Sequence, residues 1–202
     1  MNSPWDERYQ NQEGLYGSEP NAFFAEALRD CGGHSMLLPC DGEGRNAVFA
    51  AKQGWNVWSF DASQVGVTTS IRWAEEAGVT IHSVQADAFE YTPPNGPVDV
   101  VGLFYAHMPA SMRNTFHRRA LSWLKPGGII ILEGFHTEQL QFSSGGPKDL
   151  AMLLTPEILE SDFEELTVLQ NQSLRVKLDE GPLHQGAAAV CRFIGQKPQS
   201  TP

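Results

Sequence analysis

The chain has 202 residues, which is the size of one domain, since most domains contain about 100–200 residues. A hydrophobic content of 41% indicates a globular protein and excludes a disordered one. With 24 acidic and 14 basic residues, the formal net charge is -10. Because this charge repels phosphate backbones and anionic membranes, we expect neither nucleic acid nor membrane as a partner.

The cysteines and the first residues bear on the compartment. Cys31, Cys40 and Cys191 are far apart and form no C-x-x-C pair, which disfavours a zinc site. Residues 1–9 are polar, and no stretch reaches the roughly 20 apolar residues of a membrane span. We therefore expect a cytoplasmic protein with reduced thiols and no metal, either a monomer or a homodimer.

Strands and helices alternate over the first two-thirds of the chain. Ser63 is placed to cap the second helix, and Gly78 to end it. The predicted strands cover residues 35–40, 56–60, 79–85, 98–105 and 129–132, and the predicted helices cover residues 46–53, 64–77 and 109–124. Strand–helix units of this kind predict an α/β fold with a parallel sheet and right-handed crossovers.

The last third follows a different pattern. A helix near residues 155–161 precedes two long strands, 166–178 and 187–194, which residues 179–182 join as an antiparallel hairpin. We expect a single domain over residues 1–202. It divides into an N-terminal lid or helix region (1–34), a core (35–195) and a frayed tail (196–202).

The turn after the first strand carries the main functional signal. Gly42 and Gly44 lead into a helix, so backbone N–H groups at its positive end can meet an anionic group. Asp61 ends the next strand, where a carboxylate can accept both ribose hydroxyls of a nucleoside. The alternative for Asp61 is a helix cap.

A second acidic residue, Asp87, ends the third strand. It can accept from an adenine amino group while Ala88 offers its N–H to the ring; the alternative is that Asp87 caps a short helix at 88–91. The dinucleotide fingerprint G-x-G-x-x-G is incomplete, because position 47 is Ala. Two acids near the turn suit an adenosyl ligand without a pyrophosphate.

Several segments together resemble a known family, the small bacterial class I methyltransferases of the tellurite-resistance and thiopurine types. These segments are residues 42–47, 61–63 with Gly66, 124–128, 5–9 and 16–21, with 133–135, 145–148 and 184–186 resembling one branch of the group. The resemblance implies a Rossmann-like fold with a central, mostly parallel seven-stranded sheet and an antiparallel C-terminal hairpin. It also implies S-adenosylmethionine as the methyl donor.

The resemblance also implies site residues. Gly42 and Gly44 would line the methionine part of the donor, and Tyr105 would lie beside the sulfonium. The implied cofactor-binding residues are Gly42, Glu43, Gly44, Asn46, Asp61, Ala62, Asp87, Ala88, Phe89, Tyr105, Tyr9 and Tyr16. One departure from the D-x-G-x-G pattern is clear, because Leu38 and Cys40 replace the acid and the first glycine. Asp41 or Glu43 are the candidates to replace the missing acid.

Methyl transfer is an in-line displacement that depends on positioning and on exclusion of water. Trp5, Tyr9 and Tyr16 are candidates for an aromatic lid over the cationic donor, or alternatively for a hydrophobic cover on an N-terminal helix. His107 follows the fourth strand and is the candidate general base, with a helix cap as its alternative. The candidate acceptor contacts are Trp5, His136, Arg175 and His184.

The sequence thus predicts methyl transfer from S-adenosylmethionine to a small-molecule acceptor such as a thiol or an oxyanion. Two alternatives stay open. One is a protein that binds S-adenosylmethionine or S-adenosylhomocysteine without catalysis, which the changes at Leu38 and Cys40 favour. The other is a nicotinamide-dependent oxidoreductase.

Overall fold

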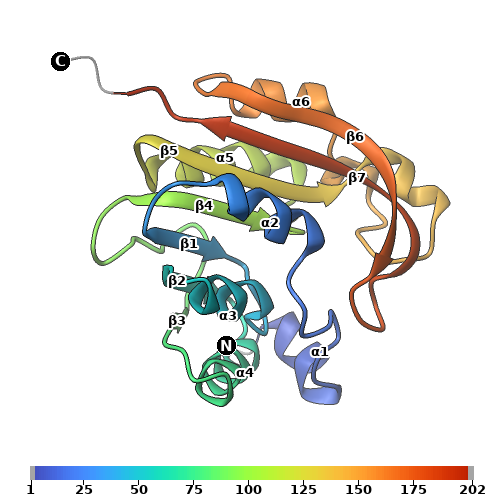
Figure 1. Ribbon diagram of the computed structural model, residues 1–202. Helices are drawn as coiled ribbons and strands as arrows, with labels where there is room; N and C mark the ends of the chain where they lie inside the picture. Colours follow the sequence, from blue (N-terminus) through green and yellow to red (C-terminus); the bar gives the residue numbers. More distant parts are fainter. Residues whose placement is uncertain (1–2, 200–202) are drawn as a thin grey trace.

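A seven-stranded sheet forms the centre of the protein, in a computed structural model that describes residues 3–199 (Figure 1). Its strand order is β3-β2-β1-β4-β5-β7-β6. The first five strands pair in parallel, and β7 pairs antiparallel with both β5 and β6. The strands are β1 (Ser35–Pro39), β2 (Asn56–Asp61), β3 (His82–Gln85), β4 (Val98–Phe104), β5 (Leu124–Phe135), β6 (Thr167–Asp179) and β7 (Gln185–Gln196). The predicted Rossmann-like fold is confirmed.

Helices cover both faces of this sheet. Helices α2 and α3 lie in front of it in Figure 1, and α5 lies behind it. The α-helices are α1 (Pro4–Asn11), α2 (Ala22–Ala27), α3 (Arg45–Lys52), α4 (Gln64–Glu76), α5 (Ala110–Ser122) and α6 (Pro156–Asp162). Short 3-10 helices are η1 (Leu28–Asp30), η2 (Thr137–Gln141) and η3 (Leu150–Met152). Within residues 3–199, no helix is long and apolar enough to cross a membrane.

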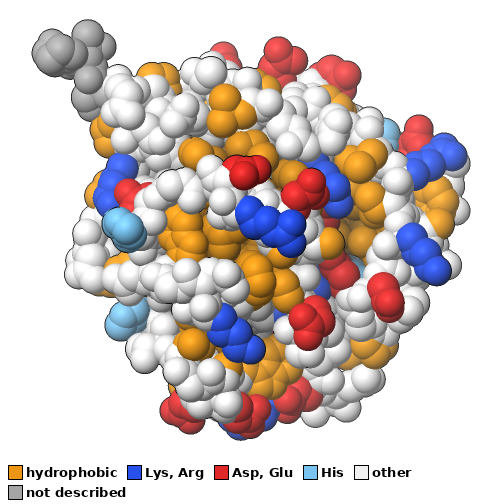
Figure 2. Space-filling model, viewed as in Figure 1, with side chains coloured by type: hydrophobic (Ala, Val, Ile, Leu, Met, Phe, Trp, Pro, Cys, Tyr) orange, Lys and Arg blue, Asp and Glu red, His pale blue; other side chains and the backbone are white. Residues whose placement is uncertain are grey.

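The sheet separates two apolar clusters. Strands turn alternate side chains to opposite faces, so Leu37 and Val101 join the cluster under α5, while Leu38 and Val100 join the one under α2 and α3. All four are nearly inaccessible. On the outside of the α2 and α3 face, hydrophobic side chains emerge in patches between scattered charged ones (Figure 2).

Several predicted boundaries were wrong. Helix α5 ends at Ser122, and β5 begins at Leu124, because Leu124 already pairs with Val98. Strand β3 starts only at His82. The predicted frayed tail begins too early, since Gln196 pairs within the sheet and Lys197 Nζ donates to the carbonyls of residues 121 and 124. Residues 200–202 of that tail lie outside the described residues.

The direction of crossover reverses between β1 and β4. From β1 the chain adds β2 and then β3 toward one edge of the sheet, whereas β4 lies on the opposite side of β1 and the later strands extend toward the other edge. In open α/β sheets, ligands bind at this switch point, beyond the carboxyl ends of the strands. The turn after β1, Asp61 at the end of β2 and Tyr105 after β4 all meet at this edge.

Candidate functional site

The turn between β1 and α3 is built on left-handed backbone. Gly42 and Gly44 have φ angles of 58° and 84°, values that side chains other than glycine rarely adopt. A Cβ at Gly42 would collide with the hydroxyl of Tyr9, and one at Gly44 would collide with Ser70. Cys40 also has a positive φ of 55°, where the usual motif has glycine. The missing side chains of Gly42 and Gly44 therefore let Tyr9 and Ser70 pack directly against the turn.

Asp61 ties this turn to the end of β2. Its Oδ2 accepts the N–H of Gly42 at 2.9 Å, and its Oδ1 accepts the N–H of Ser63 at 2.8 Å. The carboxyl is buried, and this burial raises its pKa. Helix α4 is capped by Ser63, whose Oγ accepts from Gly66, so Asp61 is not the helix cap. Each carboxylate oxygen keeps a lone pair for a ligand hydroxyl.

Asp87 lies at the same edge and is exposed. Its Oδ1 accepts the N–H of Phe89 at 2.7 Å, and its carbonyl accepts from residues 90 and 91. Asp87 thus caps the short turn that follows it, which was the alternative to binding adenine. Arg119 fixes this loop by donating to the carbonyls of Ala88 and Tyr91. The loop thus offers one exposed carboxylate on a fixed backbone.

Three polar side chains of the turn form hydrogen bonds within the chain: Asp41, Glu43 and Asn46. Asp41 accepts the N–H of Ala47 and the amide of Asn46, and burial raises its pKa to about 7. Glu43 accepts the N–H groups of residues 14 and 15. The Asn46 side chain accepts from the backbone of residue 21. Of the two candidates for the missing acid, Asp41 organises the turn and Glu43 holds the N-terminal segment.

That N-terminal segment, residues 3–21, covers the turn. Asp6 accepts from the Ser63 hydroxyl at 2.6 Å, which fastens α1 to the start of α4. Tyr9 is buried against Gly42 and Gly66. Trp5 stacks on Tyr9 with 6.1 Å between ring centroids and stays 41% exposed. Of the three predicted lid residues, Tyr9 contacts the turn, and Trp5 lies outside it.

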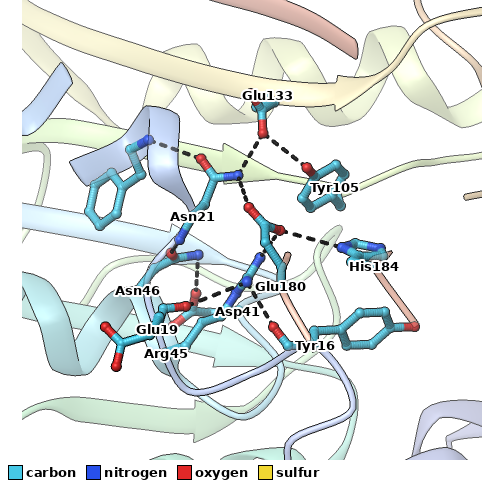
Figure 3. A network of polar contacts seen from close by, with 11 residues as sticks. Tyr16, Glu19, Asn21, Asp41, Arg45, Asn46, Tyr105, Glu133, Glu180 and His184 are labelled. Atoms are coloured by element: carbon cyan, nitrogen blue, oxygen red, sulfur yellow. Dashed lines mark hydrogen bonds and ion pairs between the residues drawn. The ribbon is translucent and has the colours of Figure 1, made fainter. Parts of the chain in front are cut away.

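A buried network of charged side chains lies beside the turn (Figure 3). Arg45 Nη2 pairs with Glu180 Oε2 at 2.9 Å, and its Nη1 donates to the carbonyl of Tyr16. Asn21 Nδ2 bridges Glu180 Oε1 and Glu133 Oε1, at 3.1 and 2.6 Å. The network therefore joins α3, the N-terminal segment, β5 and the β6–β7 turn.

Glu133 extends the network to the end of β4. Its Oε1 also accepts the hydroxyl of Tyr105 at 2.9 Å, and its Oε2 accepts Arg192 Nε at 2.6 Å. Burial and the neighbouring Glu133 raise the pKa of Tyr105, so this phenol stays protonated. Tyr105 has a φ of 54°, an uncommon backbone conformation for a residue with a side chain. The strained turn holds Tyr105 at the switch-point edge.

His184 lies among three aromatic rings. Its centroid is 4.6 Å from Tyr16, 4.5 Å from Tyr105 and 5.3 Å from Phe135. Its Nδ1 is buried 3.5 Å from Glu180 Oε2 and makes no hydrogen bond, and among residues 3–199 no hydrogen bond to its Nε2 is found either. Burial lowers its pKa, whereas Glu180 opposes this shift. The imidazole is therefore neutral near pH 7 and has a nitrogen free to accept a proton.

The Gly-rich loop 143–147 packs its backbone on this cluster. A Cβ at Gly145 would lie 2.7 Å from the His184 ring, and one at Gly146 would lie 2.7 Å from Phe135. Both glycines also have positive φ angles. Because the loop has no side chains there, it can close directly over the two rings.

His107 does not fit the predicted role of general base. Its Nδ1 contacts the carbonyl of Met152 at 2.8 Å, and its Nε2 accepts the N–H of Phe135 at 3.0 Å. Burial lowers its pKa to about 4. With both ring nitrogens bonded to backbone, His107 links β5 to η3 and has no free lone pair. It is not a helix cap either, because α5 begins after Pro109.

The other predicted acceptor contacts are on the periphery. His136 is the N-cap of η2, and its Nδ1 accepts from Glu138. Arg175 pairs with Glu138 at 2.9 Å, and its side chain is 67% exposed. The structure thus brings His184 close to Tyr105 and Tyr16, and leaves His136 and Arg175 in contacts of their own.

Comparison with known proteins agrees with this geometry. Residues 39–128, which contain the turn, Asp61, Asp87 and Tyr105, match the family model described as a methyltransferase domain. Over these residues the chain is similar to a methyltransferase domain, and S-adenosylmethionine is the methyl donor that this similarity implies. No curated protein sequence matches the chain significantly.

Solved structures share the fold of the methyltransferase domain at low sequence identity. One is a protein that converts a disulfide bond into a thioacetal group in echinomycin biosynthesis, with a TM-score of 0.79 and 15% identity over 98% of this chain and 91% of that one. TehB from Haemophilus influenzae gives a TM-score of 0.73 and 11% identity over 96% and 67%. The [4+2]-cyclase SpnF gives 0.66 and 19% over 88% and 79%. Such identities establish the fold alone.

The buried network beside the glycine turn was not predicted from the sequence. A carboxylate in an apolar strand, Glu133, was a signal, because buried charges need partners. Arg45 and Glu180 gave no comparable signal, since they are 135 positions apart.

Proposed function

We propose that the chain transfers a methyl group from S-adenosylmethionine to a small-molecule acceptor such as a thiol or an oxyanion. The arrangement of Asp61 supports this most strongly. A buried carboxylate is fixed by Gly42 N–H and Ser63 N–H at the switch point, next to a glycine turn with left-handed backbone. This combination suits the ribose and methionine parts of a nucleoside donor without a pyrophosphate.

Four residues would hold the donor in this proposal. Asp61 accepts the ribose hydroxyls, and Asp87 with the backbone of Ala88 binds the adenine. Tyr105 presents its ring to the cationic sulfonium, an interaction worth about 0.5–2 kcal/mol. Its hydroxyl is held by Glu133, so the ring needs no reordering when the donor binds. Bound S-adenosylmethionine supplies an activated methyl group.

His184 is the residue we assign to the acceptor. Its free Nε2 accepts the proton of a thiol or hydroxyl as the acceptor's lone pair bonds to the methyl carbon, while the bond from that carbon to sulfur breaks and S-adenosylhomocysteine leaves. Glu180, held by Arg45, lies 3.5 Å from Nδ1 and stabilises the resulting imidazolium. The rings of Tyr16, Tyr105 and Phe135 exclude water around it. An acceptor that is already an anion needs no such base.

Calorimetry with three ligands tests the donor assignment. We expect S-adenosylmethionine and S-adenosylhomocysteine to bind and to raise the melting temperature, and NAD to do neither. Failure of both adenosyl compounds to bind at millimolar concentration would overturn the proposal.

A turnover screen tests the acceptor assignment, with thiols, thiopurines, tellurite and small amines. We expect His184→Gln to lower kcat about 100-fold or more for a neutral thiol. The effect on an oxyanion should be much smaller. His136→Gln is the matched control, because His136 only caps η2, and it should retain activity. Equal losses for thiol and oxyanion would leave His184 with a positioning role only.

A binding protein without catalysis is the second candidate, favoured by the motif change. Leu38 is buried in the core and supplies no acid to the donor edge. Donor binding without formation of S-adenosylhomocysteine across the whole screen would favour this alternative.

A further inference from the structure

A cavity of about 470 Å³ lies apart from the donor edge. The segment 17–22 forms one wall, and the other walls come from Glu133 on β5, Arg192 on β7 and the end of β6. Pockets for small ligands usually measure about 300–1,000 Å³. The cavity therefore has the size of a small-molecule site.

This cavity is separated from the methyl-transfer site. None of the predicted donor residues lines it, and neither do Tyr105 and His184. The wall between the two spaces is Glu133 and Glu180, with the Asn21 amide bonded to both at 2.6 and 3.1 Å. A ligand in the cavity would touch the outer side of this wall without reaching the transferred methyl group.

Two cationic side chains in the cavity lining have unused hydrogen-bond donors. Glu133 and Glu180 are each neutralised by an arginine, Arg192 and Arg45. Arg192 uses only its Nε for Glu133, and within residues 3–199 its two terminal nitrogens bond to nothing. Lys177 also lines the cavity and, over the same residues, makes no hydrogen bond or ion pair. Free guanidinium nitrogens in a half-enclosed site select a carboxylate.

The rest of the lining has a different character. Glu19 and Asp179 also line the cavity and are exposed; Asp179 Oδ1 accepts from Gln185 Nε2, and the Glu19 carboxylate has no bonded partner in the described part of the chain. Such carboxylates favour an ammonium group. Val176, Leu178 and Pro20 add apolar side chains to the lining. The cavity thus offers cationic, anionic and apolar side chains to one ligand.

We propose that this cavity is a second binding site, for a zwitterionic amino acid with an apolar side chain. Its carboxylate bonds to Arg192 and Lys177, its ammonium faces Glu19 and Asp179, and its side chain contacts Val176 and Leu178. Because Glu133 and Glu180 also hold Tyr105 and His184, the bound amino acid is an effector of the methyl-transfer site and is not methylated.

Calorimetry with L-leucine and its singly charged analogues tests the ligand class. The analogues are 4-methylpentanoate, which lacks the amine, and 3-methylbutylamine, which lacks the carboxylate. We expect L-leucine or L-phenylalanine to bind without methyl donor, and each leucine analogue to bind at least ten-fold more weakly than leucine. No binding of either amino acid at millimolar concentration would overturn the proposal. So would an analogue that binds as well as leucine.

Variants test the location. Val176→Phe fills the cavity and leaves the ion pairs in place, so it should abolish binding, whereas Lys177→Ala and Glu19→Gln should weaken it about ten-fold. Arg175→Ala is the matched control, on the same strand but paired with Glu138. Unchanged leucine affinity in Val176→Phe would contradict the site. Methylation of leucine would show an acceptor pocket instead. Donor binding is measured separately, so the failure of either proposal is distinguishable.

Discussion

The carboxylates of this protein fall into two regions that are held in different ways. At the turn, Asp41 and Asp61 accept backbone N–H groups within a few ångströms of their own strands. In the buried network, Glu133 and Glu180 are held by the arginine side chains of Arg192 and Arg45. The first region is assembled by the fold of two adjacent strand ends, while the second needs elements from both ends of the chain.

This difference separates binding from stability. Backbone N–H groups at the turn remain in place when a ligand arrives, so Asp61 can hold the turn and still accept from a ribose. A carboxylate neutralised by a buried arginine has no such freedom, because leaving either charge buried without its partner costs several kcal/mol. We therefore expect variants of the network to lower stability, and variants of the turn to lower donor affinity.

Arg45→Met should have the largest effect. It leaves Glu180 buried without its cation, and we expect a loss of about 3–5 kcal/mol in the free energy of unfolding. Urea denaturation measures this loss. The double variant Arg45→Met/Glu180→Gln should recover part of it, because no buried charge is then unpaired. A double variant as unstable as the sum of the single ones would mean that the two residues act independently.

Asp61→Asn should come next, with an effect on binding. The amide cannot accept at both positions, so we expect at least a ten-fold loss of affinity for S-adenosylhomocysteine, about 1.4 kcal/mol or more. Asp99→Asn is the matched control, since Asp99 also accepts backbone N–H groups but lies at the start of β4. Equal affinity loss in both variants would show a general effect on folding.

Asp41→Asn should differ from the other variants because its effect on stability depends on pH. The pKa of Asp41 is raised from 3.8 to about 7 in the folded protein. Between these values the unfolded chain loses this proton while the folded chain keeps it, so rising pH destabilises the wild type. The melting temperature of Asp41→Asn relative to wild type should therefore increase from pH 4 to pH 7 and stay constant above pH 7. Each kcal/mol of difference in the free energy of unfolding corresponds to roughly 2–4 °C. A difference that is the same at all pH values would contradict the raised pKa.

Local signals made much of the fold predictable. Ser63 caps α4 as expected, and the residue 179–182 turn joins two antiparallel strands, because both features depend on a few neighbouring residues. The end of α5 was placed two residues too late. Its helical pattern continued into Leu124, which instead pairs with Val98. A strand pairing of this kind is decided by a distant segment and leaves no mark in the local pattern.

The site was predictable to a similar extent. The glycine turn and Asp61 were found because strand ends of a parallel sheet meet at one edge. The base was assigned to His107 because of its position after β4, yet its ring nitrogens are taken by backbone groups of residues 135 and 152. His184, on the hairpin, reaches the edge because β6 and β7 extend beyond β5. Only the three-dimensional path of the hairpin shows this.

The contact of Glu43 with the N-terminal segment has a consequence for kinetics. Its two oxygens accept the amide protons of Gly14 and Leu15, at 2.8 and 3.2 Å, in the segment that carries Tyr9 over the turn. Those amide protons exchange with solvent only when the segment detaches, whereas the amide protons of β1 and β4 exchange only when the whole protein unfolds. Hydrogen-exchange rates at Gly14 and Leu15 therefore report how often the cover opens. If product release limits turnover, these rates set its upper bound.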